Sequence, residues 1–203
     1  MRPELHLLYL LRIEPLHIPG HADDPSHESD LPVLLEGCRR NDRASQEKLY
    51  RRYAGTMMDT VRRYTSDRDT AFHILNNGFL KAFQHIAQYA FQGSFEGWLR
   101  KIMTNAVAEH FRSKRPDPNV TITSELPEHI AKYEGHQPLE YKDLLALLQR
   151  LPPATRIVIN LFLIEGYTHK EIAAMTGISV GTSKWHVAEG KKLLQQMLPN
   201  GTF

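Results

Sequence analysis

Residues 166–194, GYTHKEIAAMTGISVGTSKWHVAEGKKLL, carry the signals of two short helices joined by a tight turn. Thr168 can cap a helix over 170–175, and Ser179 can cap another that begins at 180, because a hydroxyl satisfies free N–H groups at a helix start. Gly177 suits the turn, since glycine readily adopts the left-handed conformation that ends many helices. The segment therefore predicts a helix-turn-helix.

The apolar residues of this segment predict a small core, and the remaining positions predict an outward face. In a helix-turn-helix, the early residues of the second helix meet base edges and phosphates in the major groove. The alternative is that any helical hairpin needs a glycine at its turn and that lysines at a helix end only complement its dipole. The residues expected inside are Ile172, Ala173, Ile178, Val187 and Leu194. Those expected outside are Val180, Thr182, Ser183, Lys184 and His186, with Lys191 and Lys192 adding backbone contacts.

Two further helices are predicted before this motif. Leu144, Leu147, Leu148 and Leu151 recur with helical spacing, Pro152 and Pro153 interrupt the pattern, and 156–164 is apolar again. Residues 139–198 are therefore expected to form one helix-turn-helix domain. Residues 116–138 contain four prolines and no clean periodicity, which predicts a flexible linker before this domain.

Residues 30–115 predict another helical domain. Asp30, Asp67 and Ser94 can cap helices, and the last helix ends in the basic run HFRSKR before Pro116. Apolar residues recur every three or four positions, and no sheet-like alternation is present. The inward stripes are Leu49, Tyr53, Met57 and Val61; Leu75, Phe79, Phe83 and Ile86; and Trp98, Leu99, Ile102 and Ala106. The predicted fold is all-α, with two small helical domains joined by the linker.

Composition excludes several classes of protein. The 203 residues are 41% hydrophobic, and 25 Lys and Arg balance 23 Asp and Glu, so nucleic-acid binding would have to come from local basic patches. Cys38 is the single cysteine, which excludes an internal disulfide and a multi-cysteine metal cluster and fits the cytoplasm. No stretch approaches the roughly 20 apolar residues that span a bilayer.

Residues 1–29 are predicted to be a flexible N-terminal extension. Their apolar run from Leu7 to Leu11 is interrupted by Arg12 and Pro15, so it makes a poor signal peptide. The spacing of the extension's histidines does not place them on one helix face, which favours a solvated tail over a metal site. These histidines are His6, His17, His21 and His27.

Several segments occur together in a specific order. They are LLEGCRRNDRASQEKLYRRYAGTMMDTVRRYT (34–65), FLKAFQHI (79–86), GSFEGWLRKIMTNAVAEHFRSKR (93–115), LPPATR (151–156) and KEIAAMTGISVGTSK (170–184). This combination resembles the extracytoplasmic-function (ECF) sigma factors of bacterial RNA polymerase. The resemblance covers about residues 33–115 and 139–196, including the order of the two domains.

The resemblance implies three binding surfaces. The helix with ILNNGFLKAF would dock on core RNA polymerase through Asn76, Asn77, Phe79, Leu80 and Lys81. The fourth helix would melt and read the minus-ten element through Arg100, Lys101, Asn105, His110, Arg112, Lys114 and Arg115. The second domain would read the minus-thirty-five element through Thr182, Ser183, Lys184 and His186, with Lys191 and Lys192 on the backbone. Trp98 fits the core better than a base-stacking role.

The sequence departs from the family pattern both in the helix that would dock on polymerase and in the second domain. Family members usually carry a glutamine and an acidic residue where Asn76 and Asn77 stand, so an ion pair with the polymerase is lost. Glu189 stands near a common arginine and would repel phosphate, and Trp185 replaces a small polar residue. Weaker polymerase docking and an unusual promoter preference are the expected consequences.

The function implied is binding and strand capture, with no enzymatic step. No catalytic residues, metal ligands, cofactor or small-molecule substrate are expected, since the histidines, carboxylates and Cys38 form no catalytic pattern. The implied partners are core RNA polymerase, promoter DNA and an anti-sigma factor, which is often membrane-bound in the family. Two alternatives remain: a helix-turn-helix regulator that acts without polymerase, and a sigma-like interaction module without productive polymerase docking.

Overall fold

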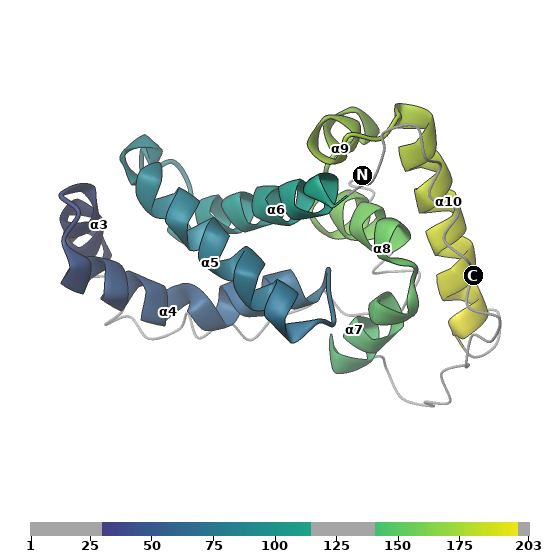
Figure 1. Cartoon of the computed structure of the whole chain (residues 1–203), viewed down its shortest axis with the longest axis horizontal. Coiled ribbons are helices and arrows are strands. Elements are labelled where there is room, and N and C mark those ends of the chain that lie inside the picture. Colours follow the sequence, from purple (N-terminus) through teal and green to yellow (C-terminus); the bar gives the residue numbers. More distant parts are fainter. Residues whose placement is uncertain (1–29, 115–140, 199–203) are drawn as a thin grey trace. The chain divides into compact units, whose positions relative to one another are not determined.

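The computed structural model describes residues 30–114 and 141–198, and every regular element in these two ranges is a helix (Figure 1). The chain divides into two compact units, and the division falls between His110 and Phe111. The predicted all-α class is confirmed for these ranges. The predicted N-terminal extension with its four histidines, the linker over 116–138 and Arg115 lie outside the described residues.

The elements of the first unit are α3 (Leu31–Arg39), α4 (Arg43–Arg62), α5 (Arg68–Gln84), a 3₁₀ turn (Ile86–Gln88) and α6 (Phe95–Ser113). Helices α4, α5 and α6 begin where short polar side chains cap them, whereas the predicted cap Asp30 makes no side-chain capping bond at α3 and instead pairs with Arg52 at 2.7 Å. Asp42 accepts a hydrogen bond from the Ser45 backbone N–H at 2.8 Å, and Asp67 accepts one from that of Thr70 at 2.8 Å. Ser94 Oγ accepts from the backbone N–H of Gly97 at 3.1 Å.

One apolar core holds these helices together. Leu49 and Met57 of α4, Leu75 of α5, and Leu99 and Met103 of α6 are all buried in it. Burying a side chain of this size contributes about 1.5–3 kcal/mol. The predicted stripes on the three longer helices therefore face the core. Trp98 is partly buried against the same cluster, as the core interpretation of this residue predicted.

The second unit has α7 (Tyr141–Arg150), α8 (Pro153–Ile159), α9 (His169–Thr176) and α10 (Val180–Met197). The sequence predicts one helix over the apolar segment 156–164. In the structure α8 ends at Ile159, and a π-helical turn, Asn160–Ile164, follows it. The Asn160 side-chain amide donates to the Arg156 carbonyl at 2.8 Å, and the Asn160 carbonyl accepts from the Glu165 backbone N–H at 3.0 Å. The turn is therefore closed by hydrogen bonds at both ends.

A buried arginine joins α7 to α8. Arg156 donates through Nη2 to the carbonyls of Gln149 at 2.6 Å and Leu151 at 3.0 Å. These carbonyls belong to the end of α7, where backbone acceptors have no partner within the helix. Burial lowers the pKa of the Arg156 guanidinium from its ordinary value. The arginine of LPPATR thus closes the corner between the two helices.

The helix-turn-helix forms with the caps that the sequence predicted. Thr168 and Glu171 form a capping box at the start of α9, and Ser179 Oγ accepts from the Thr182 backbone N–H at 2.9 Å at the start of α10. Gly177 has φ 73°, the left-handed conformation predicted for the turn. None of the helices in the described ranges is long and apolar enough to cross a membrane.

Close packing at a glycine fixes α10 against α8. A Cβ atom added at Gly190 would lie 2.5 Å from Ile159 Cγ1 and 2.9 Å from Thr155 Cγ2, both on α8. Cβ atoms essentially never lie within 3.0 Å of another side-chain carbon, so a residue without Cβ fits this point of the contact. The inward face of α10 is thereby defined.

Candidate nucleic-acid interface

Helix α10 has one buried face and one exposed face. The buried face carries Ser183, His186, Val187, Gly190, Leu193, Leu194 and Met197. Their spacing of three or four residues is that of a stripe on one side of a helix. The opposite face exposes Val180, Gly181, Lys184, Trp185 and Ala188. This second set is the surface that α10 offers to a ligand, and it is called the α10 outer face below.

The prediction that Ser183 and His186 face outward is wrong. Ser183 is 0% exposed and its hydroxyl hydrogen bonds with His169 Nδ1 at 3.0 Å, while His186 is 2% exposed and its Nδ1 hydrogen bonds with Thr155 Oγ1 at 2.9 Å. A helix turns by about 100° per residue, which puts both on the side of Val187. Polar groups are tolerated there because each has a hydrogen-bond partner.

His169, the hydrogen-bond partner of Ser183, is held by its surroundings on α9. Burial, and to a smaller extent the charge of Lys184, lowers the pKa of His169 from its ordinary value. The ring also stacks on Phe162 with the ring centroids 4.5 Å apart and an interplanar angle of 14°. His169 therefore packs on Phe162 and supports α10 from α9 through its hydrogen bond with Ser183.

The other predicted residues of this helix divide into two groups. Lys184, Lys191 and Lys192 are exposed, although Lys192 Nζ lies 3.8 Å from the Glu189 carboxylate. Thr182 is partly buried, and its hydroxyl hydrogen bonds with that of Ser179 at 2.9 Å. The lysines can meet phosphates directly, whereas Thr182 mainly helps to start the helix.

Trp185 is the large side chain that the predicted set of binding residues omitted. It is 52% exposed on the α10 outer face, one position before the buried His186. The signal that could have found it is the spacing of Val187 and Leu194, seven residues apart, which fixes the buried side of the helix. Two residues at about 100° each give about 200° of rotation. Trp185 therefore lies roughly 160° from Val187, measured the shorter way around the helix axis.

Helix α6 gathers part of its predicted set on one face. Lys101, Asn105 and Arg112 are exposed, and their positions fall within about 40° of one another around the helix axis. Lys114 is also exposed, at the end of the described range, but lies on another side of the axis. The face formed by Lys101, Asn105 and Arg112 is called the α6 basic face below.

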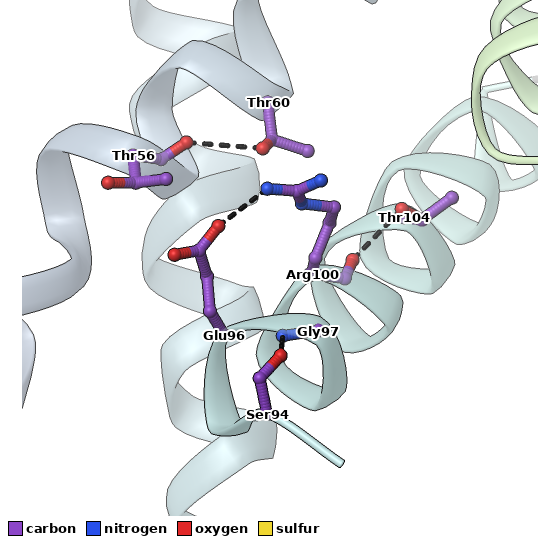
Figure 2. Close-up of polar contacts among 7 residues, drawn as sticks. All are labelled: Thr56, Thr60, Ser94, Glu96, Gly97, Arg100 and Thr104. Carbon is purple, nitrogen blue, oxygen red and sulfur yellow. Dashed lines mark hydrogen bonds and ion pairs between the residues drawn. The ribbon is translucent and has the colours of Figure 1, made fainter. Parts of the chain in front are cut away.

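Two predicted residues of α6 do not belong to this face. Arg100 donates through Nη2 to Glu96 at 2.6 Å, and Figure 2 shows its side chain directed toward α4, where the Thr60 hydroxyl donates to the Thr56 carbonyl at 3.1 Å. His110 is partly buried, with its ring centroid 5.3 Å from that of His73 on α5. Both side chains are therefore engaged within the first unit.

The predicted polymerase-binding residues of α5 are also divided. Leu80 is 56% exposed, and Asn76, one helical turn earlier, is exposed and accepts a hydrogen bond from the Tyr50 hydroxyl at 3.1 Å. Phe79 is 2% exposed and packs on Tyr50 with ring centroids 4.5 Å apart. It therefore lies in the core, as the inward stripe predicted, and its expected place among the polymerase-binding residues is corrected. Lys81 forms an ion pair with Glu109 of α6. Asn77 is partly buried.

Comparison with protein families gives two matches along the chain. Residues 49–116 match the family described as Sigma-70 region 2, and residues 141–194 match Sigma-70, region 4. The first match includes α5 and α6, and the second includes the helix-turn-helix. Two such regions in this order define a protein of the sigma-70 class. The chain belongs to the extracytoplasmic-function group of the sigma-70 family of RNA polymerase sigma factors.

Individual relatives are distant. The chain is 28% identical over 161 residues to the ECF RNA polymerase sigma factor SigE of Mycolicibacterium smegmatis. The aligned residues cover 76% of this chain and 62% of SigE. The chain is 26% identical over 184 residues to the ECF RNA polymerase sigma factor BldN of Streptomyces coelicolor, covering 87% of this chain and 70% of BldN. The chain thus spans less than two thirds of the length of SigE.

One solved structure that the chain matches is that of the sigma factor RpoE in complex with the anti-sigma factor NepR from Bartonella quintana. It is 20% identical to this chain, covers 85% of it and 96% of the RpoE chain, and gives a TM-score of 0.42.

Proposed function

We propose that this chain directs core RNA polymerase to promoters by contacting DNA at two separate surfaces, the α6 basic face and the α10 outer face. The observation that carries the proposal is that each sigma-70 region presents exposed cations on one face of a helix whose other face is held in a core. Sigma factors of this family act by binding, so no enzymatic step is part of the proposal.

The α10 outer face is proposed to bind the upstream, double-stranded element. Lys184 projects from the early part of the recognition helix, and Lys191 follows two turns later. Phosphate contacts of this kind fix the position of the protein on the duplex, and contacts with base edges add sequence preference. Glu189 is partly buried beside Lys192, so its charge partly offsets that of the lysine.

The α6 basic face is proposed to hold the downstream element as it melts. Separated strands need cations near their phosphates, and Lys101 and Arg112 are the exposed cations of this face. Asn105 lies between them and can both donate and accept hydrogen bonds with a base edge. Arg100 and His110, which are engaged elsewhere in the unit, are proposed to support the helix rather than touch DNA.

Core polymerase is proposed to contact α5 at Asn76, Asn77 and Leu80. Leu80 offers exposed apolar surface, of the kind that is buried at protein interfaces. An anti-sigma factor is proposed as the regulator that competes for such surfaces, and the cytoplasm is the proposed compartment. The alternative, a sigma-like module without productive docking, is motivated by the absence of a carboxylate at Asn77.

The test is run-off transcription with purified core polymerase on a library of upstream fragments from the source genome. We expect transcripts that require the protein and that are lost in the Lys101→Ala/Arg112→Ala double variant. The matched control is Lys48→Ala, which removes an exposed cation of α4 outside the proposed surfaces.

Salt dependence adds a second measurement. Removing two phosphate contacts should reduce the slope of log affinity against log salt by about 2, since each contact contributes about 1. Specific duplex binding without core-dependent transcripts would reject the proposal and favour a regulator that acts without polymerase. Binding to core polymerase without transcripts would favour the sigma-like interaction module.

A further inference from the structure

Trp185 occupies an open position on the α10 outer face. It is 52% exposed, and its neighbours one turn away on the same face are Gly181 and Ala188, which have no side chain or a single methyl group. Helical side chains lean toward the preceding turn, and the residue one turn before Trp185 is Gly181. Small residues there leave the edge of the ring accessible to a ligand.

The indole is also supported from below. The Trp185 and His186 rings meet edge-on, with centroids 4.9 Å apart and an interplanar angle of 70°. His186 is itself held by its hydrogen bond to Thr155 on α8. A side chain that is already restrained loses less conformational entropy on binding, so the arrangement favours recognition.

The surroundings of Trp185 favour nucleic acid over an apolar partner. Lys184, Lys191 and Lys192 are exposed on the same helix, and these positive charges complement phosphate. Val180 is the other large apolar side chain exposed on α10, and its position is about 140° from that of Trp185 around the axis. The two therefore do not form a continuous apolar patch of the kind that protein interfaces bury.

We propose that Trp185 is a specificity-determining residue that reads an A·T pair in the major groove by apolar contact with the C5-methyl group of thymine. The inference rests on the proposed binding of duplex DNA by α10 and names the base that this surface selects. Indole has one N–H donor and no acceptor, so it cannot form the bidentate hydrogen bonds that identify guanine or adenine. Thymine is the base with a methyl group in this groove, and an aromatic edge suits it.

The test begins with a promoter found in the run-off experiment and replaces each upstream thymine, one at a time, with deoxyuridine. This change removes the methyl group and leaves the hydrogen-bonding groups in place. Holoenzyme made with the full chain should bind about four-fold more weakly at one or two of these positions, from the burial of a single methyl-sized group. Trp185→Ser holoenzyme should bind the thymine and deoxyuridine promoters equally.

The matched control is Val33→Ser, which changes an apolar residue of α3 that is 70% exposed and outside the proposed surfaces. This variant should keep the full response to deoxyuridine. Thermal unfolding of both variants should match the wild-type protein, because each side chain is largely outside the core. Binding of both variants to core polymerase, measured without DNA, should also be unchanged.

Three results would overturn the inference. Transcription that depends on the protein but ignores deoxyuridine at every upstream position would reject the role of Trp185 and leave the proposed function standing. Loss of core polymerase binding in Trp185→Ser would assign the indole to a protein contact instead. The absence of any core-dependent transcript would reject the inference together with the proposed function.

Discussion

Replacing Gly190 with alanine should destabilise the second unit, whereas the same change at Gly55 should stabilise the first. Both glycines lie inside long helices, α10 and α4, so alanine gains about 0.8–1.0 kcal/mol of helix propensity at either position. Nothing lies within 4 Å of a Cβ added at Gly55. At Gly190 the Cβ would meet Ile159 and Thr155 of α8 at 2.5 and 2.9 Å, and overpacking of this kind costs about 1–3 kcal/mol.

The expected changes follow from these two terms. Gly190→Ala should lower the free energy of unfolding by up to about 2 kcal/mol, and Gly55→Ala should raise it by up to about 1 kcal/mol. For units of this size 1 kcal/mol corresponds to a Tm shift of about 4–8 °C. Thermal unfolding of the full chain, followed by circular dichroism, measures both. Equal stabilisation by the two changes would refute the close approach of α10 to α8.

Three further predictions concern caps, a buried hydrogen bond and a thiol. Thr168→Ala should cost about 1 kcal/mol of stability through the lost capping box of α9, measured by urea unfolding, and no change in the midpoint would contradict this. Thr155→Val removes the hydrogen bond between Thr155 Oγ1 and buried His186 Nδ1 and should cost about 1–3 kcal/mol, whereas an unchanged midpoint would show that this bond contributes little to stability. Burial, and to a smaller extent Asp42, raises the pKa of Cys38 to about 11, so the folded state favours the protonated thiol. The stability that Cys38 contributes should therefore fall as pH rises from about 9 toward 11, and Cys38→Ala should remove this part of the pH dependence measured by unfolding.

Several helix starts could be predicted from local signals alone, although Asp30, also predicted as a cap, makes no side-chain capping bond. Asp67, Ser94, Thr168 and Ser179 each cap a helix in the structure, because capping depends on a side chain and the backbone a few residues away. Gly177 likewise takes the left-handed turn predicted for it. These features require no knowledge of the tertiary fold.

The orientation of polar residues could not be predicted in the same way. Ser183 and His186 look like surface residues, yet both are buried because His169 and Thr155 supply hydrogen bonds from other helices. Arg100 has a basic side chain in a basic helix, but Glu96 one turn earlier holds it. For Ser183 and His186 the deciding partner lies on another helix, and for Arg100 it lies one turn away on the same helix.

The division of α5 shows the same dependence. Asn76 and Leu80 lie one turn apart and are exposed, while Phe79 between them is in the core with Tyr50. A family motif identifies a segment of the chain that binds a partner. Within that segment, the helical period separates the exposed residues, which can contact the partner, from the buried residues, which pack in the core. The burial of each side chain in the structure shows which residues belong to which group, and the motif alone does not.

The π-helical turn at Asn160–Ile164 has a consequence for how this fold tolerates changes in length. A single π turn is geometrically an α-helix that has accepted one additional residue. Each residue rotates the direction of the chain by about 100° about the helix axis, so the turn acts as a phase shift between α8 and everything that follows. Deleting one residue within 160–164 should restore an ordinary helix and point the helix-turn-helix in a different direction while leaving its own caps intact. The direction of α10 thus depends on a π-helical turn that ends at Ile164, 16 residues before α10 begins at Val180.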